Sequence, residues 1–99
     1  MLLMPEYRFS PAAERDLAEI WRYTSKQWGN DQANRYTLAL KTMCTNLAEA
    51  PQQGQSCANI RLGYRRRSAE HHVIYFRETD YGIAVVRVLH QRMDATRHL

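Results

Sequence analysis

The spacing of apolar residues predicts one short strand and two helices in the first half of the chain. Residues 7–9 alternate between apolar and polar side chains, which is the period of a strand with one buried face. A helix is predicted next, because one of its faces collects apolar positions 13, 17, 20, 21, 24 and 28, with Thr24 counted as neutral. A second helix with a narrow apolar seam is predicted from positions 33, 36, 40, 43, 47 and 50.

Capping residues predict where these helices begin and end. Ser10 can accept from the free N–H groups of a first turn, and Pro11 suits the first helical position. Gly29 predicts the end of the first helix in a left-handed conformation, and Asn30 or Asp31 is expected to cap the second. Because only Gly29 and Asn30 separate the two helices, they must fold back as an antiparallel hairpin.

The second half of the chain predicts three consecutive strands. Pro51 stops the second helix, and a polar loop at 52–56 follows it. Alternating and β-branched residues then predict strands at 61–67, 72–77 and 83–90. We therefore expect a single α+β domain over residues 1–99, in the order β-α-α-β-β-β, with the helical hairpin packed on a small and mainly antiparallel sheet.

Both faces of the last two predicted strands are apolar. Val73 and Tyr75 share one face, and Ile74 and Phe76 share the other. The helical hairpin can cover only one of these faces, so the second needs another cover. We expect a partner chain laid on the sheet or its edge, and the alternative is that the tail 91–99 folds back over it.

Aromatic and cysteine residues of the helices are expected to be structural. Packing is favoured over ligand binding for the four large aromatic residues on or beside the hairpin, which are Trp21, Tyr23, Trp28 and Tyr36. Cys44 is predicted to be a small buried thiol of the second helix. Cys44 and Cys57 show no C-x-x-C spacing, which argues against a zinc site, while a disulfide stays open.

The positive charge lies in the second half of the chain. Residues 1–50 carry six Lys or Arg and six Asp or Glu, whereas residues 51–99 carry eight Arg and four acids, which accounts for the net charge of +4. Twelve of the fourteen cations are Arg, whose planar fork pairs bidentately with phosphate or carboxylate. This composition suits a nucleic acid or an acidic protein partner, and the alternative is a solvated charged face.

Candidate catalytic residues are few. The sequence has no glycine-rich phosphate loop, no H-E-x-x-H motif and no nucleophile elbow. Adjacent His71 and His72 point to opposite faces of a strand, so they cannot bind one metal ion together. A metal-free ribonuclease site is conceivable from the remaining basic set, which is Arg65, Arg67, Arg87 and His90. The sequence leaves three alternatives for the second proton-transfer group of such a site: Tyr64, Tyr75 and Glu78.

No membrane segment or cofactor is expected. Residues 1–4 are too short for the apolar core of a signal peptide, and the sequence has no apolar run of 18 residues. We therefore expect a cytoplasmic protein that binds no metal and no cofactor.

Three groups of residues, in this order, carry a family resemblance. The first is Ala13-x-x-Asp16-Leu17-x-x-Ile20-Trp21-x-Tyr23 ahead of Trp28-Gly29. The second is Gln32-Ala33-x-x-Tyr36 ahead of Leu47-Ala48-x-x-Pro51-x-x-Gly54. The third is Arg61-x-Gly63-Tyr64-Arg65 and His71-His72-Val73-Ile74-Tyr75-Phe76-Arg77 ahead of Val86-x-Val88-Leu89-His90-x-x-Met93-Asp94. Over residues 6–99 the chain resembles a ParE-type toxin of the RelE/ParE superfamily.

The resemblance implies the toxin of a type II toxin–antitoxin system with a RelE/ParE-like fold. It implies a ParD-like antitoxin whose DNA-binding part is a ribbon-helix-helix dimer and whose flexible C-terminal segment wraps the toxin. It further implies a non-enzymatic inhibitor of DNA gyrase, which reaches DNA only through the antitoxin or gyrase.

Two alternatives to a gyrase inhibitor stay open. The RelE branch of the superfamily cleaves messenger RNA in the ribosome, and His90 matches its late histidine. Gln91, however, stands where some of those nucleases carry Tyr. This difference favours an inhibitor of gyrase over a ribonuclease. The other alternative is a non-toxic interaction module.

Two sets of residues are expected to contact these partners. The antitoxin is expected on the sheet and its flanks, at Arg61, Arg65, Tyr75, Arg77 and Arg87. The target is expected at the end of the last strand and on the tail, at His90, Arg92, Met93, Arg97 and His98. A frayed tail is the alternative for the second set.

Overall fold

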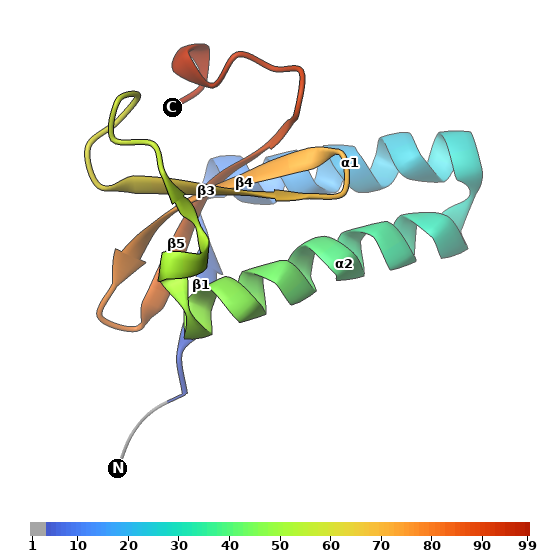
Figure 1. Cartoon of the computed structure of the whole chain (residues 1–99). Coiled ribbons are helices and arrows are strands. Elements are labelled where there is room, and N and C mark those ends of the chain that lie inside the picture. Colours follow the sequence, from blue (N-terminus) through green and yellow to red (C-terminus); the bar gives the residue numbers. More distant parts are fainter. Residues whose placement is uncertain (1–3) are drawn as a thin grey trace.

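A computed structural model, which describes residues 4–99, shows two antiparallel helices packed on a five-stranded sheet (Figure 1). The elements are β1 (Glu6–Phe9), α1 (Pro11–Trp28), α2 (Asn30–Glu49), β2 (Gln55–Ser56), β3 (Tyr64–Ala69), β4 (His72–Thr79) and β5 (Gly82–His90). Short 3-10 turns lie at Pro51–Gln53 and Ala95–Arg97. The predicted α+β class and element order are confirmed, and the predicted polar loop contains the additional strand β2. Residues 1–3, where no signal segment is expected, lie outside the described residues.

The sheet is mixed, with the order β1-β5-β4-β3-β2. β1 runs parallel to β5, and the other pairs are antiparallel, as predicted for a mainly antiparallel sheet. Tyr75 pairs with Arg87 but Phe76 pairs with Val85, so a bulge leaves Val86 without a direct partner. Because of this extra residue, Val85 and Val88 both lie in the core beneath the helices.

The start of α1 follows the prediction. Ser10 Oγ accepts from the N–H of Ala13 at 3.0 Å, and Pro11 occupies the first turn. The same hydroxyl donates to the carbonyl of Val86 at 2.7 Å, and Ser10 N–H donates to the carbonyl of Val85 at 2.9 Å. The cap therefore fixes the helix to β5 as well as starting it.

Gly29 alone joins the two helices. It ends α1 and precedes α2 with φ of 93° and ψ of 167°. The positive φ was predicted, but ψ is extended rather than left-handed helical. The predicted cap by Asn30 or Asp31 is wrong, because Asn30 is already helical and its side chain accepts from Ser25 instead. No helix within residues 4–99 is long and apolar enough to cross a membrane.

The main core lies between the hairpin and the sheet. The seam predicted for α2 is too narrow, since its buried residues are Ala33, Thr37, Leu40, Cys44, Leu47 and Ala48. Tyr36, Met43 and Ala50, which belong to the predicted seam, are only half-buried. The buried stripe is wide because α2 packs against α1 on one side and against β1, β3 and β5 on another.

The second face of the sheet is partly covered by the chain itself. Cys57, Tyr75, Leu89 and Ala95 form a buried cluster on this face, and Ile60 and Leu99 pack against it. In Figure 1 the C-terminal tail and the segment before β3 accordingly lie on the same side of the sheet. The folded tail, which was the alternative, covers part of this face together with the segment before β3, and a partner chain on the sheet or its edge stays a prediction. The final 3-10 turn returns Ala95 and Leu99 over Tyr75.

Candidate interaction surfaces

Arg87 is held by an acidic residue of α1. Its Nε and Nη2 lie 2.7 and 2.8 Å from the two carboxylate oxygens of Asp16. Its Nη1 also donates to the carbonyl of His98 at 3.2 Å, which ties the tail to the sheet. The hydrogen bonds that Arg87 donates to the Asp16 carboxylate raise the pKa of Arg87. Arg87, predicted to contact the antitoxin, thus has its guanidinium engaged within the chain.

Arg65 and Arg67 share the helix-covered face of the sheet, because they pair with the core residues Phe76 and Ile74. Both donate to backbone carbonyls of the segment before β2, Arg65 to Gly54 at 3.0 Å and Arg67 to Gln53 at 3.1 Å. Arg65 Nε also lies 3.5 Å from the carboxylate of Glu78. The four candidate ribonuclease residues are therefore not gathered at one site, since three of them bond to separate groups and His90 lies elsewhere.

Three arginines form an exposed surface that we name the arginine face: Arg61, Arg66 and Arg77. Directly opposed residues share a face of a sheet, so the pairs Tyr64–Arg77 and Arg66–Tyr75 lie together on the second face. The Arg61 guanidinium lies 5.5 Å from the ring centre of Tyr64. Among residues 4–99, none of the three arginines has a carboxylate within ion-pair distance.

The residues predicted for antitoxin contact differ in their exposure. Arg61 and Arg77 are exposed, Arg65 is half-buried, and Tyr75 is only 4% exposed beneath the tail. Arg66 is exposed on the same face as Arg77 and is not among the predicted residues. The alternation of side chains along β3 separates Arg66 from Arg65 and Arg67, and that signal was present in the sequence.

A cavity of about 670 Å³ lies where the hairpin meets the ends of β4 and β5. We name it the histidine pocket, and its lining includes Tyr23, Trp28, Arg35, Tyr36, His72 and His90. Tyr36 is central to it: its hydroxyl accepts from the N–H of His71 at 3.0 Å and lies 2.6 Å from His72 Nδ1. The His72 and His90 rings meet edge to face at 5.3 Å.

His72 is uncharged at neutral pH. Burial first, and then the neighbouring His90 and His71, lower its pKa to about 4, while Asp16 opposes them. The Nδ1 of the neutral ring shares a hydrogen bond with the Tyr36 hydroxyl. His90 Nδ1 accepts from the backbone N–H of Arg92 at 3.1 Å. Both rings therefore offer Nε2 as their remaining polar atom.

Two aromatic residues on the rim of this pocket contradict the prediction of packing. Trp28 is 74% exposed and Tyr23 is 67% exposed. Trp21 and Tyr36 are half-buried, and Trp21 Nε1 donates to Asn34 at 2.9 Å. Exposed Trp and Tyr side chains beside a pocket are typical of protein contact sites.

The residues predicted for target contact divide between two regions. His90 lies on the helix side, in the histidine pocket. Arg92, Met93 and Arg97 are exposed on the tail, which is folded rather than frayed. Asp94 caps the last turn by accepting from the Thr96 N–H at 3.0 Å, and hydrogen bonds from Thr96 lower its pKa.

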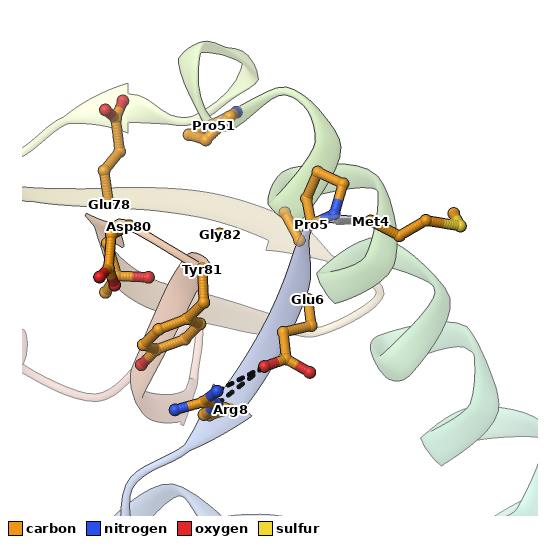
Figure 2. A pocket seen from close by; sticks show the side chains of 11 residues that line it. Met4, Pro5, Glu6, Arg8, Pro51, Glu78, Asp80, Tyr81 and Gly82 are labelled. Atoms are coloured by element: carbon orange, nitrogen blue, oxygen red, sulfur yellow. Dashed lines mark hydrogen bonds and ion pairs between the residues drawn. The ribbon is translucent and has the colours of Figure 1, made fainter. Parts of the chain in front are cut away.

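A second cavity of about 670 Å³ lies at the opposite end of the sheet, and Glu78 is the one predicted candidate residue in its lining (Figure 2). Its lining includes Glu6, Arg8, Glu78, Asp80 and Tyr81. Figure 2 shows Arg8 beside Glu6 and Tyr81. The Arg8 guanidinium lies 2.6 Å from the Glu6 carboxylate and 3.9 Å from the centre of the Tyr81 ring. The main cation of this cavity is therefore paired within the chain.

The cysteines are free thiols, both of them buried, so the open possibility of a disulfide is not realised. Burial raises the pKa of Cys44 to about 12, which keeps it protonated. Residues 4–99 contain no group of three or more His, Cys, Asp or Glu side chains arranged to hold a metal ion.

Comparison with known proteins identifies the family. The model of the ParE toxin of type II toxin–antitoxin system, parDE, matches residues 7–95. Toxin ParE1 of Mycobacterium tuberculosis is 48% identical over 94 residues, covering 94% of this chain and 96% of that protein. Toxin ParE1 of Caulobacter vibrioides is 41% identical over 96 residues, covering 97% of this chain and 99% of the relative.

A more distant relative and a solved structure agree. Toxin ParE of Escherichia coli is 31% identical over 97 residues, covering 97% of this chain and 94% of that protein. A structure described as the chromosomal ParDE TA system from P. aeruginosa shares the fold, with a TM-score of 0.75, 19% identity and coverage of 88% of this chain and 96% of that chain. The chain therefore belongs to the ParE family, the toxins of type II toxin–antitoxin systems of the parDE kind.

Proposed function

We propose that this toxin inhibits DNA gyrase and that a ParD-like antitoxin neutralises it. The observation that carries the proposal is its similarity to ParE toxins over nearly the whole chain. We propose further that the toxin acts by binding, without chemistry of its own.

The surroundings of the basic residues support binding over catalysis. Arg87 is paired with Asp16, and Arg65 and Arg67 hold the carbonyls of Gly54 and Gln53. These three guanidinium groups are directed at separate partners within the chain, and not at one common site where a pentavalent phosphate would be stabilised.

Arg61 and Arg77 are the proposed contacts for acidic side chains of the antitoxin, and Arg65 is a further proposed contact on the opposite face of β3. The exposed and unpaired guanidinium groups of Arg61 and Arg77 support this role. Tyr75 and Arg87 drop out of the contact set, because one is buried and the other is paired. The variant Arg61→Glu/Arg77→Glu should weaken the toxin–antitoxin complex by about 2 kcal/mol or more in calorimetric titration. Unchanged affinity would remove the assignment.

The proposed target contacts are His90, Arg92, Met93, Arg97 and His98. The folded tail supports this proposal by presenting Arg92, Met93 and Arg97 to solvent on a fixed base. On the helix side, the exposed Tyr23 and Trp28 extend the surface around His90.

Supercoiling by purified gyrase tests the function. The toxin in stoichiometric excess should inhibit supercoiling and accumulate cleaved DNA, and prior addition of the antitoxin encoded beside it should restore activity. Full supercoiling with no cleaved DNA would overturn the gyrase proposal. Site-specific cuts in a defined message in a translation extract, abolished by His90→Ala, would instead indicate a ribonuclease.

A further inference from the structure

We infer that the free toxin binds backbone phosphates of duplex DNA directly, through the arginine face of Arg61, Arg66 and Arg77. This goes beyond the proposed contacts with gyrase and antitoxin. It also departs from the expectation that DNA is reached only through another protein.

Strands β3 and β4, with the turn before β3, hold the three guanidinium groups of the arginine face close together. Tyr64 pairs with Arg77 and Arg66 pairs with Tyr75, so Arg66 and Arg77 are diagonal neighbours on adjacent strands. Diagonal neighbours stand about 7–8 Å apart, a separation that suits successive phosphates along one strand. Arg61 joins them from the preceding turn, with its guanidinium 5.5 Å from the centre of the Tyr64 ring.

The charge of this face is uncompensated. Glu78, which follows Arg77 in β4, lies 3.5 Å from Arg65 Nε instead. Other arginines of the second half are also occupied, as Arg87 is by Asp16. The excess of four positive charges in residues 51–99 is therefore concentrated on exposed side chains such as these.

A polar hollow of about 580 Å³ beside Arg66 favours a sugar–phosphate backbone over an acidic peptide. Its lining contains Gln53, Gln55, Arg67, Ser68 and Gln91, and no carboxylate. Amide, hydroxyl and guanidinium groups are the side chains that most often contact DNA phosphates and sugars. An acidic peptide would more typically anchor an apolar side chain in an apolar pocket, and Val73 is the one apolar residue here.

Fluorescence anisotropy of a labelled 20-base-pair duplex, titrated with the full chain between 50 and 200 mM NaCl, tests the inference. Three phosphate contacts predict a slope of about −2.7 for log K against log salt concentration, since each contributes about −0.9. Arg66→Gln/Arg77→Gln should reduce the slope to about −0.9. The control Arg15→Gln/Arg35→Gln removes the same charge from exposed helix positions and should leave the slope near −2.7.

Three results would overturn the inference. The first is absence of duplex binding at 50 mM NaCl. The second is an equal loss of slope in both double variants, because binding would then follow net charge alone. The third is tighter, arginine-dependent binding of a 20-residue polyglutamate probe than of the duplex, because Arg61 and Arg77 would then serve only the acidic antitoxin contacts proposed above.

A single substitution outside the sheet tests the inference even if the double variant in the strands fails to fold. Arg61→Gln lies in a turn outside the sheet and should reduce the slope to about −1.8, with an unchanged circular dichroism spectrum. A slope still near −2.7 would remove Arg61 from the face. Gyrase supercoiling is measured separately, so a failure of DNA binding leaves the gyrase proposal standing.

Discussion

Asp16 of α1 and Arg87 of β5 lie 71 residues apart in the sequence and form a bidentate ion pair. β1 accompanies β5 only as far as Val85, and beyond that point Asp16 Oδ2 accepts from the N–H of Val88 at 3.0 Å. Beyond Val85, the Asp16 carboxylate therefore supplies the hydrogen-bond acceptor that a neighbouring strand would otherwise supply to β5. Since Arg87 also holds the His98 carbonyl, one acidic side chain joins the helix, the sheet and the tail.

Removing this carboxylate should destabilise the protein strongly. Asp16→Ala leaves the Arg87 guanidinium and the Val88 N–H without their main partner in a half-buried site. We expect a loss of about 3 kcal/mol in the free energy of unfolding, measured by urea denaturation. Glu14→Ala, at an exposed position of the same helix, is the control and should cost less than about 0.5 kcal/mol. Equal effects of the two variants would contradict the role of Asp16.

The Tyr36 hydroxyl should contribute measurably to stability. Tyr36→Phe removes both the acceptor of the His71 N–H and the hydrogen-bond partner of His72 Nδ1. We expect a loss of about 1–2 kcal/mol in urea denaturation. Tyr23→Phe, on the exposed rim of the same pocket, should leave stability unchanged. A Tyr36→Phe protein as stable as the parent would show that water replaces the hydroxyl.

Acid should destabilise the protein through His72. Its pKa is about 4 in the folded protein against 6.5 for the free side chain, so between these values the unfolded chain binds a proton that the native protein does not. The contribution is complete above pH 6.5 and is lost as the pH falls toward 4. We expect a decrease of about 2 kcal/mol, allowing for screening at this partly exposed site, in urea midpoints across that range.

A substitution separates this effect from general acid denaturation. His72→Gln should flatten the pH dependence between 6.5 and 4, because no group at this position then titrates. His98→Gln, in the tail, should retain the slope of the parent protein. A His72→Gln protein with an unchanged slope would assign the dependence to other groups.

The closeness of Gly54 to the core predicts a strict requirement for glycine. A Cβ at this position would lie 2.3 Å from Phe76 Cζ and 2.7 Å from Phe76 Cε1. Phe76 is fully buried and has no room to move, so Gly54→Ala should cost about 2–3 kcal/mol in thermal or urea unfolding. Ser56→Ala, two residues later and exposed, should be neutral. A neutral Gly54→Ala would mean that the turn before β2 shifts freely.

Local patterns in the sequence determined most of the fold. Helix periodicity, Ser10 with Pro11, and Gly29 predicted the hairpin, because apolar spacing and capping act over a few residues. Alternating apolar residues likewise predicted β4 and β5. The two-residue strand β2 has no apolar period of its own and owes its existence to pairing with Arg65 and Arg66, so it was missed.

Which arginines are free was decided only by the tertiary structure. Nothing near Arg87 in the sequence indicates that it meets Asp16, and nothing near Tyr75 indicates that Ala95 and Leu99 cover it. Such contacts arise when distant segments are brought together, and the choice of partner depends on register, including the bulge at Val86. The sequence alone therefore established the fold class and a basic second half, while long-range packing separated the structural arginines from the three that remain exposed on the arginine face.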